Sequence, residues 1–496
     1  MPSRRMFLSA ALIGLGRKTE RPIAGGFVNE SDRTGHRFRT RGPFRTPLEE
    51  VRVPIVIVGG GVAGLSAAWR LEKRGFRDFI LLELETQPGG VSRWGENEVS
   101  SYPWAAHYVP VPGAKSVLVR EMFADLGVLT PEGWNERYLC FSPQERLYLH
   151  GRWQEGLEPA IALPAREADQ FRRFEERIEG FRRSGEFTIP MARGIRASVL
   201  DRISMDEWMR DQQLSSPYLN WYVNYGCRDD YGATAAETSA WAGIHYFAAR
   251  EHEEKGPLTW PEGNGWIVRR LAERAGARLH AGEPAWRIAR EGSHVRVWTE
   301  RARYRCDAVV FAAPSFLAPY VVEDAPPVAE FEYSPWLTAN LTLERPPDPQ
   351  GEPAWDNVIY DSPALGYVVA THQRLGRPSE RSVWTFYWAL ADGPATRNRK
   401  LLLDTDWHYW KEAILHDLGR AHPNIRECVS RIDVMRLGHA MSRPVPGFLA
   451  SGQRRRMADA AGPVFYAHSD LSGISIFEEA QYRGVAAADR ALRRLG

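Results

Sequence analysis

The 496-residue chain has few cysteines and no long uninterrupted apolar stretch. The cysteines lie far apart, and none belongs to a Cys-x-x-Cys pair; they are Cys140, Cys227, Cys306 and Cys428. This spacing predicts neither a zinc site nor a disulfide framework, and it favours isolated thiols. Because no segment stays apolar over the thickness of a bilayer, we expect no transmembrane segment.

The chain also has almost no net charge, since 64 Lys and Arg residues nearly cancel 62 Asp and Glu residues. This balance gives no electrostatic reason to expect a nucleic-acid partner. Hydrophobic residues make up 44% of the sequence, which at this length suffices to bury the cores of two connected domains. We therefore expect an ordinary globular protein.

The N-terminus has the layout of a targeting segment. Arg4 and Arg5 precede a short, moderately apolar run at 9–16, and residues 1–18 resemble a twin-arginine export signal. Such a signal implies export of the folded protein to the periplasm, and the absence of an Ala-x-Ala site leaves its cleavage open. The alternative is a disordered basic N-terminus on a cytoplasmic protein. Residues 19–50 lack an apolar period and are expected to form a linker or surface arm.

A βαβ unit is predicted directly after this arm. The apolar, β-branched run at 53–58 is typical of a strand buried on both faces of a parallel sheet. Small and apolar residues at helical spacing follow at 63–74, and a second apolar run lies at 79–82. The order of strand, helix and strand is the context that a dinucleotide-binding turn requires.

Glycines fill the turn between the first strand and the helix. Gly59, Gly61 and Gly64 form Gly-x-Gly-x-x-Gly, in which the first permits a tight turn, the second lets the backbone approach a pyrophosphate, and the third allows close packing. Glu83 follows 24 residues after Gly59 (83 − 59), where a carboxylate can bind a ribose hydroxyl. A purely structural glycine loop is the alternative, and it does not account for the acid.

The residues after Glu83 distinguish FAD from NAD. Glu83 is followed by five residues and then by Gly89 and Gly90, which resembles the FAD-binding, glutathione-reductase-like families, including the flavin amine oxidases. The segment 463–488 is similar to the C-terminal part of those families. The resemblance implies FAD as the cofactor, with the glycine pair making a second close approach to it. No second Gly-x-Gly-x-x-Gly exists, so we expect no separate NAD(P)H site.

The same resemblance implies further cofactor contacts, some with altered residues. Arg93 is expected to replace an arginine that usually follows the glycine pair directly, and two alanines stand where the family has glycines. One acid is expected at the ribityl or pyrophosphate part of FAD, and the helix after it at the flavin ring. The residues so assigned are Arg93, Ala105, Ala106, Asp470, Glu479 and Ala480.

His107 and Tyr108 are the candidate catalytic residues, because they follow the predicted flavin contact. His107 can act as a base or polarise a substrate, and a structural histidine bonded to the backbone is the alternative. Tyr108, Tyr225 and Trp241 are expected either to line the pocket or to pack in the core. The family's lysine linked to oxygen reactivity is missing from 337–343, so oxygen and another electron carrier both remain open as acceptors.

The predicted fold is α/β: a doubly wound FAD-binding domain with an inserted α+β substrate domain. Helical periodicity, dense aromatics and a later alternating run mark the two insertions. The FAD-binding domain is expected at 51–115, 261–324 and 431–496, and the substrate domain at 116–260 and 325–430. Homo-oligomerisation is possible.

The function implied is an FAD-dependent oxidoreductase that oxidises an organic amine by hydride transfer to flavin N5. A desaturase or dehydrogenase of an apolar, isoprenoid-like substrate is the alternative, because such enzymes share this architecture. A third reading is a flavoprotein in which FAD is structural or supports an isomerisation. The substrate and the mode of FAD attachment stay open.

Overall fold

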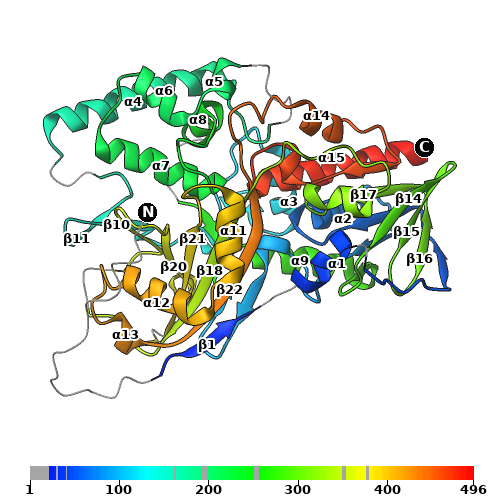
Figure 1. Cartoon of the computed structure of the whole chain (residues 1–496), viewed down its shortest axis with the longest axis horizontal. Coiled ribbons are helices and arrows are strands. Elements are labelled where there is room, and N and C mark those ends of the chain that lie inside the picture. Colours follow the sequence, from blue (N-terminus) through cyan, green and yellow to red (C-terminus); the bar gives the residue numbers. More distant parts are fainter. Residues whose placement is uncertain are drawn as a thin grey trace.

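The computed structural model describes residues 22–28, 32–40, 42–159, 163–191, 198–250, 256–348, 353–375 and 379–496. The twin-arginine-like segment lies outside these ranges. Within them the chain forms an eight-stranded sheet with helices beside it and, next to it, a smaller unit built on a parallel sheet (Figure 1). No helix in these ranges is both long and apolar enough to cross a membrane.

The smaller unit is built on a five-stranded parallel sheet. Its central strand β3 carries the unbroken apolar run predicted for a strand covered on both faces, and all four of its residues are buried. The strand order is β13 (Leu279–His280), β4 (Phe79–Leu82), β3 (Ile55–Val58), β17 (Ala308–Phe311) and β23 (Val464–Tyr466).

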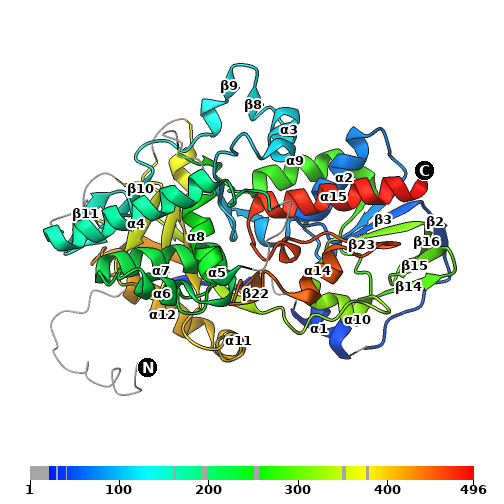
Figure 2. The same cartoon turned by 90° about the horizontal axis from the view of Figure 1, so that it is seen from above.

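The two faces of this sheet are covered differently. Ile55 and Ile57 of β3 pack into one apolar cluster with the helices, whereas Val56 and Val58 pack into another with a four-stranded sheet. The helices, close together in Figure 2, are α2 (Val62–Lys73), α9 (Gly265–Ala275) and α15 (Phe477–Leu495). The small sheet has the order β14 (Arg287–Glu291), β15 (His294–Trp298), β16 (Arg303–Cys306) and β2 (Glu50–Arg52).

The second unit is built on the eight-stranded sheet. Its longest strands, β18 (Tyr333–Leu343) and β22 (Val429–Ser442), pair antiparallel. The full order is β1 (Ala24–Phe27), β22, β18, β21 (Ser382–Ala389), β20 (Gly366–Val369), β19 (Asp356–Ile359), β10 (Glu145–Leu149) and β11 (Arg152–Glu155). The segment 19–50 therefore contributes an edge strand, β1, and also a short helix, α1 (Asp32–Thr40).

A helical layer lies beside this sheet (Figure 1). Its helices begin with regular caps: Ser204 and Glu207 form a capping box, and Ser216 precedes a proline at the start of α7. The layer comprises α4 (Ala165–Ser184), α5 (Val199–Arg202), α6 (Met205–Asp211), α7 (Pro217–Tyr231) and α8 (Ala240–Ala248).

The α/β class is confirmed, and the predicted strands and helices of both units form at the expected places. The strand pairing places one chain segment differently from the predicted domain ranges. The return to the FAD-binding unit was expected at 431, but that residue lies within β22, which pairs with β18 in the large sheet. The alternation of apolar residues along β22 is not specific to either sheet, so the sequence pattern could not locate the crossing. The four cysteines are free and buried.

Candidate active site

The glycine turn between β3 and α2 has the geometry that the sequence predicts. Gly59 has φ +107, and a Cβ on Gly64 would lie 1.8 Å from the Gly59 oxygen, so both positions require glycine. A Cβ on Gly61 would meet no protein atom within 4 Å. Gly61 caps α2 without a side-chain hydrogen bond, so backbone N–H groups of the first turn remain available to an anion.

Glu83 is held at the end of β4 beside this turn. Its Oε2 accepts a hydrogen bond from the Gly60 nitrogen at 2.5 Å, and its Oε1 accepts one from the Glu85 nitrogen at 2.8 Å. Burial raises the pKa of Glu83 and outweighs these two hydrogen bonds, which lower it. Each carboxylate oxygen has a second lone pair, so a ribose hydroxyl can still bind.

The second glycine pair lies against the first turn. The Gly89 nitrogen donates to the Gly60 oxygen at 2.9 Å, and Gly89 and Gly90 both have positive φ. A Cβ on Gly90 would have only the Gly61 Cα within 4 Å. The backbone at Gly61 and at Gly90 thus borders open space beside the buried Glu83, which fits the close approach of a dinucleotide. Arg93 Nε donates to the Gly90 oxygen at 3.1 Å.

The segment with the two alanines is held between this loop and α9. The Ala106 nitrogen donates to the Val91 oxygen at 3.0 Å, and the Ala106 oxygen accepts from the Asn264 nitrogen at 3.1 Å. The Ala105 oxygen lies 2.9 Å from His107 Nδ1. Ala105 and Ala106 therefore lie beside the predicted cofactor groove, with their backbone groups engaged by the protein.

Asp470 is fully buried and joins two strands. It accepts hydrogen bonds from the Ser315 nitrogen at 2.9 Å and from the Tyr333 hydroxyl at 2.7 Å, and His468 Nδ1 lies 3.0 Å away. Burial alone would raise the pKa of Asp470, but His468 and these donors outweigh it and lower the pKa. The acid that the sequence assigns to FAD thus also fixes the start of β18 against the end of β17.

Two neighbouring acids open α15 and face different surroundings. Glu479 accepts hydrogen bonds from the Met191 nitrogen at 2.6 Å and from the Ser472 hydroxyl at 2.5 Å. Glu478 is 2% exposed, and its Oε2 has no partner among the described residues. Burial raises the pKa of Glu478 to about 7. Ala480 follows in the same turn, with its nitrogen bonded to the Ile476 oxygen.

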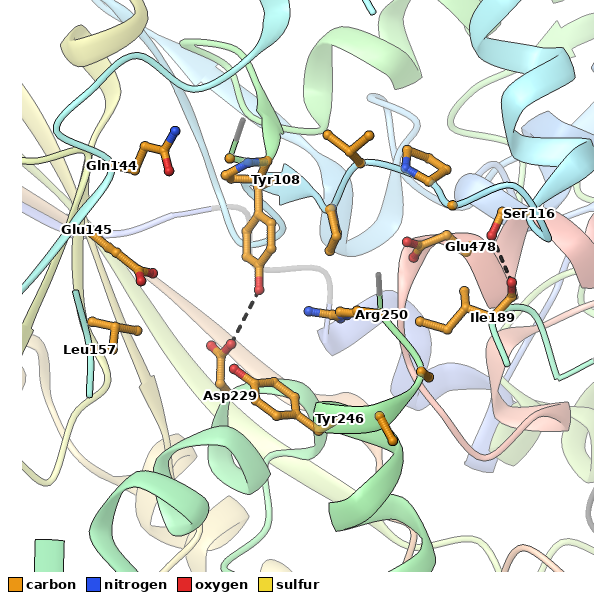
Figure 3. Close-up of a pocket in the computed structure, with 18 of the residues that line it drawn as sticks. Tyr108, Ser116, Gln144, Glu145, Leu157, Ile189, Asp229, Tyr246, Arg250 and Glu478 are labelled. Carbon is orange, nitrogen blue, oxygen red and sulfur yellow. Dashed lines mark hydrogen bonds between the residues drawn. The ribbon is translucent and has the colours of Figure 1, made fainter. Parts of the chain in front are cut away.

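Glu478 lines a cavity of about 380 Å³ between the two units (Figure 3). Aromatic rings form part of its wall, from Tyr108, Phe187, Tyr225, Tyr246 and Trp355. Four acids also line it, namely Glu145, Asp229, Asp356 and Glu478. The cavity is within the size range of small-molecule sites, roughly 300–1,000 Å³.

The acids on the sheet side of the cavity are perturbed by burial. Burial, and then the charge of Asp230, raise the pKa of Asp229 to about 7. The pKa of Asp356 is raised well above its ordinary value by burial, although the Tyr387 hydroxyl donates to its Oδ1 at 2.9 Å. Asp230 forms an ion pair with Arg250 at 3.0 Å. Perturbed acids grouped in one cavity are typical of a functional site.

The family model of the flavin containing amine oxidoreductases matches residues 62–492. The chain belongs to this family. It is an FAD-dependent oxidoreductase, as the resemblance carried by Glu83 and the following Gly89 and Gly90 implies, and its α/β fold is the one expected.

Solved structures give the same fold for this amine oxidoreductase. A putrescine oxidase is 14% identical with a TM-score of 0.67, over 90% of this chain and 100% of that one. The cyclohexylamine oxidase of Brevibacterium oxydans IH-35A is 16% identical with a TM-score of 0.67, over 89% of this chain and 99% of that one.

A short sequence match was also found. A Baeyer-Villiger monooxygenase of Penicillium patulum is 39% identical over 67 residues, which span 14% of this chain and only 9% of that protein.

The two candidate catalytic residues of the oxidoreductase occupy different positions. Tyr108 lines the cavity, and its hydroxyl lies 3.5 Å from Asp229 Oδ2. His107 is not among the lining residues; its ring packs against those of Tyr108, Trp355 and Tyr387. Burial lowers the pKa of His107 to about 4, so the ring is neutral at neutral pH.

The acids of the cavity are not among the site residues predicted from the sequence. Asp229 follows the aromatic run of α7, and a pair of adjacent carboxylates at 229–230 within that helix was an available signal. Asp356 and Glu145 reach the cavity from strands that are far apart in sequence, and nothing local identifies them. Tyr225 lines the cavity, whereas Trp241 stacks on Phe187 in the core.

Proposed function

We propose that the enzyme oxidises an organic amine bound in the acid-lined cavity. The observation that carries this proposal is the set of acids Glu145, Asp229, Asp356 and Glu478, which line one cavity with several aromatic rings. Carboxylates and aromatic faces both attract an ammonium group. An apolar, isoprenoid-like substrate would desolvate the same acids and compensate none of them. The cavity therefore favours the amine over the desaturase alternative.

The residues that would hold the cofactor are those of the two glycine loops and the acid beside them. Gly61 borders open space at the start of α2, where a diphosphate would meet the first N–H groups of the helix, and Glu83 lies beside it for the ribose. Gly90 leaves room for the rest of the dinucleotide, because a Cβ there would have only the Gly61 Cα within 4 Å. When bound, FAD supplies the acceptor for the two electrons that an amine loses.

The enzyme's own groups manage the substrate proton. An amine is a cation in water, and it must become neutral before hydride can leave the adjacent carbon. Glu478 and Asp229, with pKa values raised to about 7, can accept that proton near neutral pH. Burial raises the pKa of Tyr108 well above its ordinary value, so its hydroxyl stays protonated and can donate to Asp229.

Two further features support an exported amine-oxidising enzyme. Two solved relatives of the same fold are named for putrescine and for cyclohexylamine. Arg4 and Arg5 support export through the twin-arginine pathway to the periplasm, since that route carries folded, cofactor-loaded proteins. Oxygen or another carrier completes the cycle.

Anaerobic titration of the purified holoenzyme tests the reaction. Aliphatic diamines, aromatic monoamines and amino acids are added in turn, and apolar polyenes are added in a parallel series, while the flavin absorbance is recorded. We expect at least one class of amine to bleach the flavin and the polyenes to leave it unchanged. Bleaching by polyenes alone would refute the amine proposal, and bleaching by no donor would refute any redox role.

A further inference from the structure

Asn264 occupies the N-cap position of α9 but does not cap the helix. Asparagine is common at this position because its side-chain oxygen accepts a hydrogen bond from an N–H of the first turn. Here the backbone of Asn264 is already helical, with φ −63 and ψ −9, and the side chain makes no such bond. The cap position therefore does not explain this asparagine.

The side-chain oxygen of Asn264 has no other partner either. The residue is 2% exposed, and its Oδ1 is buried without a hydrogen bond to any of the described residues. A buried amide loses its hydrogen bonds to water, and a folded protein normally replaces them. A bound molecule can supply the donor that the protein does not.

The turn before α9 packs closely against the segment with the two alanines. A Cβ on Gly263 would lie 2.7 Å from the His107 Cα, so no side chain fits there. The Asn264 nitrogen donates to the Ala106 oxygen at 3.1 Å. Asn264 is therefore held against the segment that leads from the predicted flavin contact to Tyr108 in the cavity wall.

The first turn of α9 also packs against the loop of the second glycine pair and the residues after it. A Cβ on Gly265 would lie 2.5 Å from the Trp94 Cβ, and one on Gly89 would lie 3.1 Å from Val268 Cγ1. Because α9 has 11 residues, its N-terminus also attracts electron-rich groups. The unpartnered amide of Asn264 thus lies where two segments beside the predicted cofactor groove meet a helix N-terminus.

We infer that Asn264 binds the flavin part of FAD through its side-chain amide. A flavin ring carries N–H and C=O groups side by side on its pyrimidine edge, and an amide can accept from the one and donate to the other. Glu83 is placed for the adenosine ribose, whereas the segment that Asn264 holds continues to Tyr108. Asn264 therefore lies toward the flavin end of the cofactor. The inference does not depend on which substrate the enzyme oxidises.

Binding of FAD and of ADP to the apoprotein tests this assignment. ADP contains the adenosine and diphosphate of FAD without the flavin, so it reports on the rest of the site. Asn264→Leu approximately keeps the volume of the side chain and removes both of its polar groups. We expect its Kd for FAD to rise about tenfold and its Kd for ADP to stay within about twofold of the wild-type value.

The stability of the apoprotein distinguishes this role from a structural one. Asn264→Leu removes a buried polar group that has no partner, so the apoprotein Tm should stay the same or rise. Asn398→Leu is the matched control, because Asn398 is also buried but its Nδ2 donates to three backbone oxygens. This control should lower the apoprotein Tm and leave the Kd for FAD unchanged.

Two results would overturn the inference. An unchanged Kd for FAD in Asn264→Leu would mean that water supplies the missing partner. An equal rise in the Kd values for FAD and ADP would mean that the substitution changes the shape of the whole groove. If Asn264→Leu does not fold, Asn264→Ala allows the same comparison with a smaller side chain.

Discussion

The Tyr108 hydroxyl points at the Asp229 carboxylate across the cavity wall, with Oη 3.5 Å from Oδ2 (Figure 3). Tyr108 follows the segment beside the predicted cofactor groove, and Asp229 comes from α7 of the inserted unit. The contact therefore joins the two units at the place where substrate is proposed to bind. At this length it is weaker than an ordinary hydroxyl–carboxylate hydrogen bond, which spans about 2.5–3.0 Å.

Replacing Tyr108 with Phe keeps the ring and removes the donor. We expect kcat/KM for the preferred amine to fall about two- to fivefold, because a hydrogen bond of this length contributes about 1 kcal/mol or less. Most of the loss should appear in KM, since Tyr108 positions Asp229 and does not take up the substrate proton. Steady-state kinetics on Tyr108→Phe and on the control Tyr409→Phe, at an exposed ring of α12 (Trp407–Leu418), check this. A loss of 100-fold or more in kcat would instead assign chemistry to the hydroxyl.

Asp229 should make the stability of the enzyme depend on pH. Its pKa is raised from 3.8 to about 7 in the folded chain, so between these values the folded state holds a proton that the unfolded state has lost. Stability from this group is present below about pH 4 and is lost as pH rises through 7. Asp229→Asn removes the ionisable group and therefore the loss of stability that its ionisation causes. Relative to wild type, its free energy of unfolding should increase from pH 4 to pH 7 by up to a few kcal/mol, at about 1.4 kcal/mol per pH unit, and then level off.

Urea unfolding of both proteins at pH 4.5, 6 and 8 measures that difference. A saturating amine should shrink it at pH 8, because the ammonium group pairs the ionised carboxylate in wild type alone. A difference that stays constant with pH would mean that Asp229 ionises normally in the folded chain.

Much of the cofactor half could be predicted from the sequence, and much of the substrate half could not. Gly59, Gly61 and Glu83 lie in one short segment whose local order dictates a turn, so spacing alone places them together. Asp229, Asp356 and Glu478 come from a helix, a strand and a second helix that meet only after the sheet and the insertions assemble. The local pattern of apolar residues does not show that these three acids come together. Nor does it show which of the adjacent acids Glu478 and Glu479 faces the cavity, because that depends on how α15 is rotated about its axis.

The glycine turn allows cofactor binding to be separated from folding. A side chain at Gly61 would meet no protein atom, whereas one at Gly64 would collide with the Gly59 oxygen. We therefore expect Gly61→Val to fold with an apoprotein Tm near that of wild type, while its Kd for FAD rises more than tenfold. Gly64→Ala should lose apoprotein stability directly, because helix and turn can no longer approach.

Flavin-to-protein absorbance ratios, FAD titration and apoprotein melting curves distinguish these cases. If Gly61→Val bound FAD as wild type does, the open space beside the turn would not be the diphosphate site. If it lost apoprotein stability as Gly64→Ala does, its effect on FAD would be explained by misfolding.

Export can be tested without touching the folded domain. Twin-arginine transport depends on the arginine pair itself, so Arg4→Lys with Arg5→Lys keeps the charge and removes the feature that is recognised. We expect the double variant to accumulate in the cytoplasm with its flavin bound and its specific activity unchanged. Arg17→Lys, outside the pair, should be exported as wild type is. Fractionation of cells followed by flavin fluorescence of each fraction gives the distribution. A double variant found in the periplasm in wild-type amount would show that the N-terminus is not a twin-arginine signal, and the proposed site of action would then move to the cytoplasm.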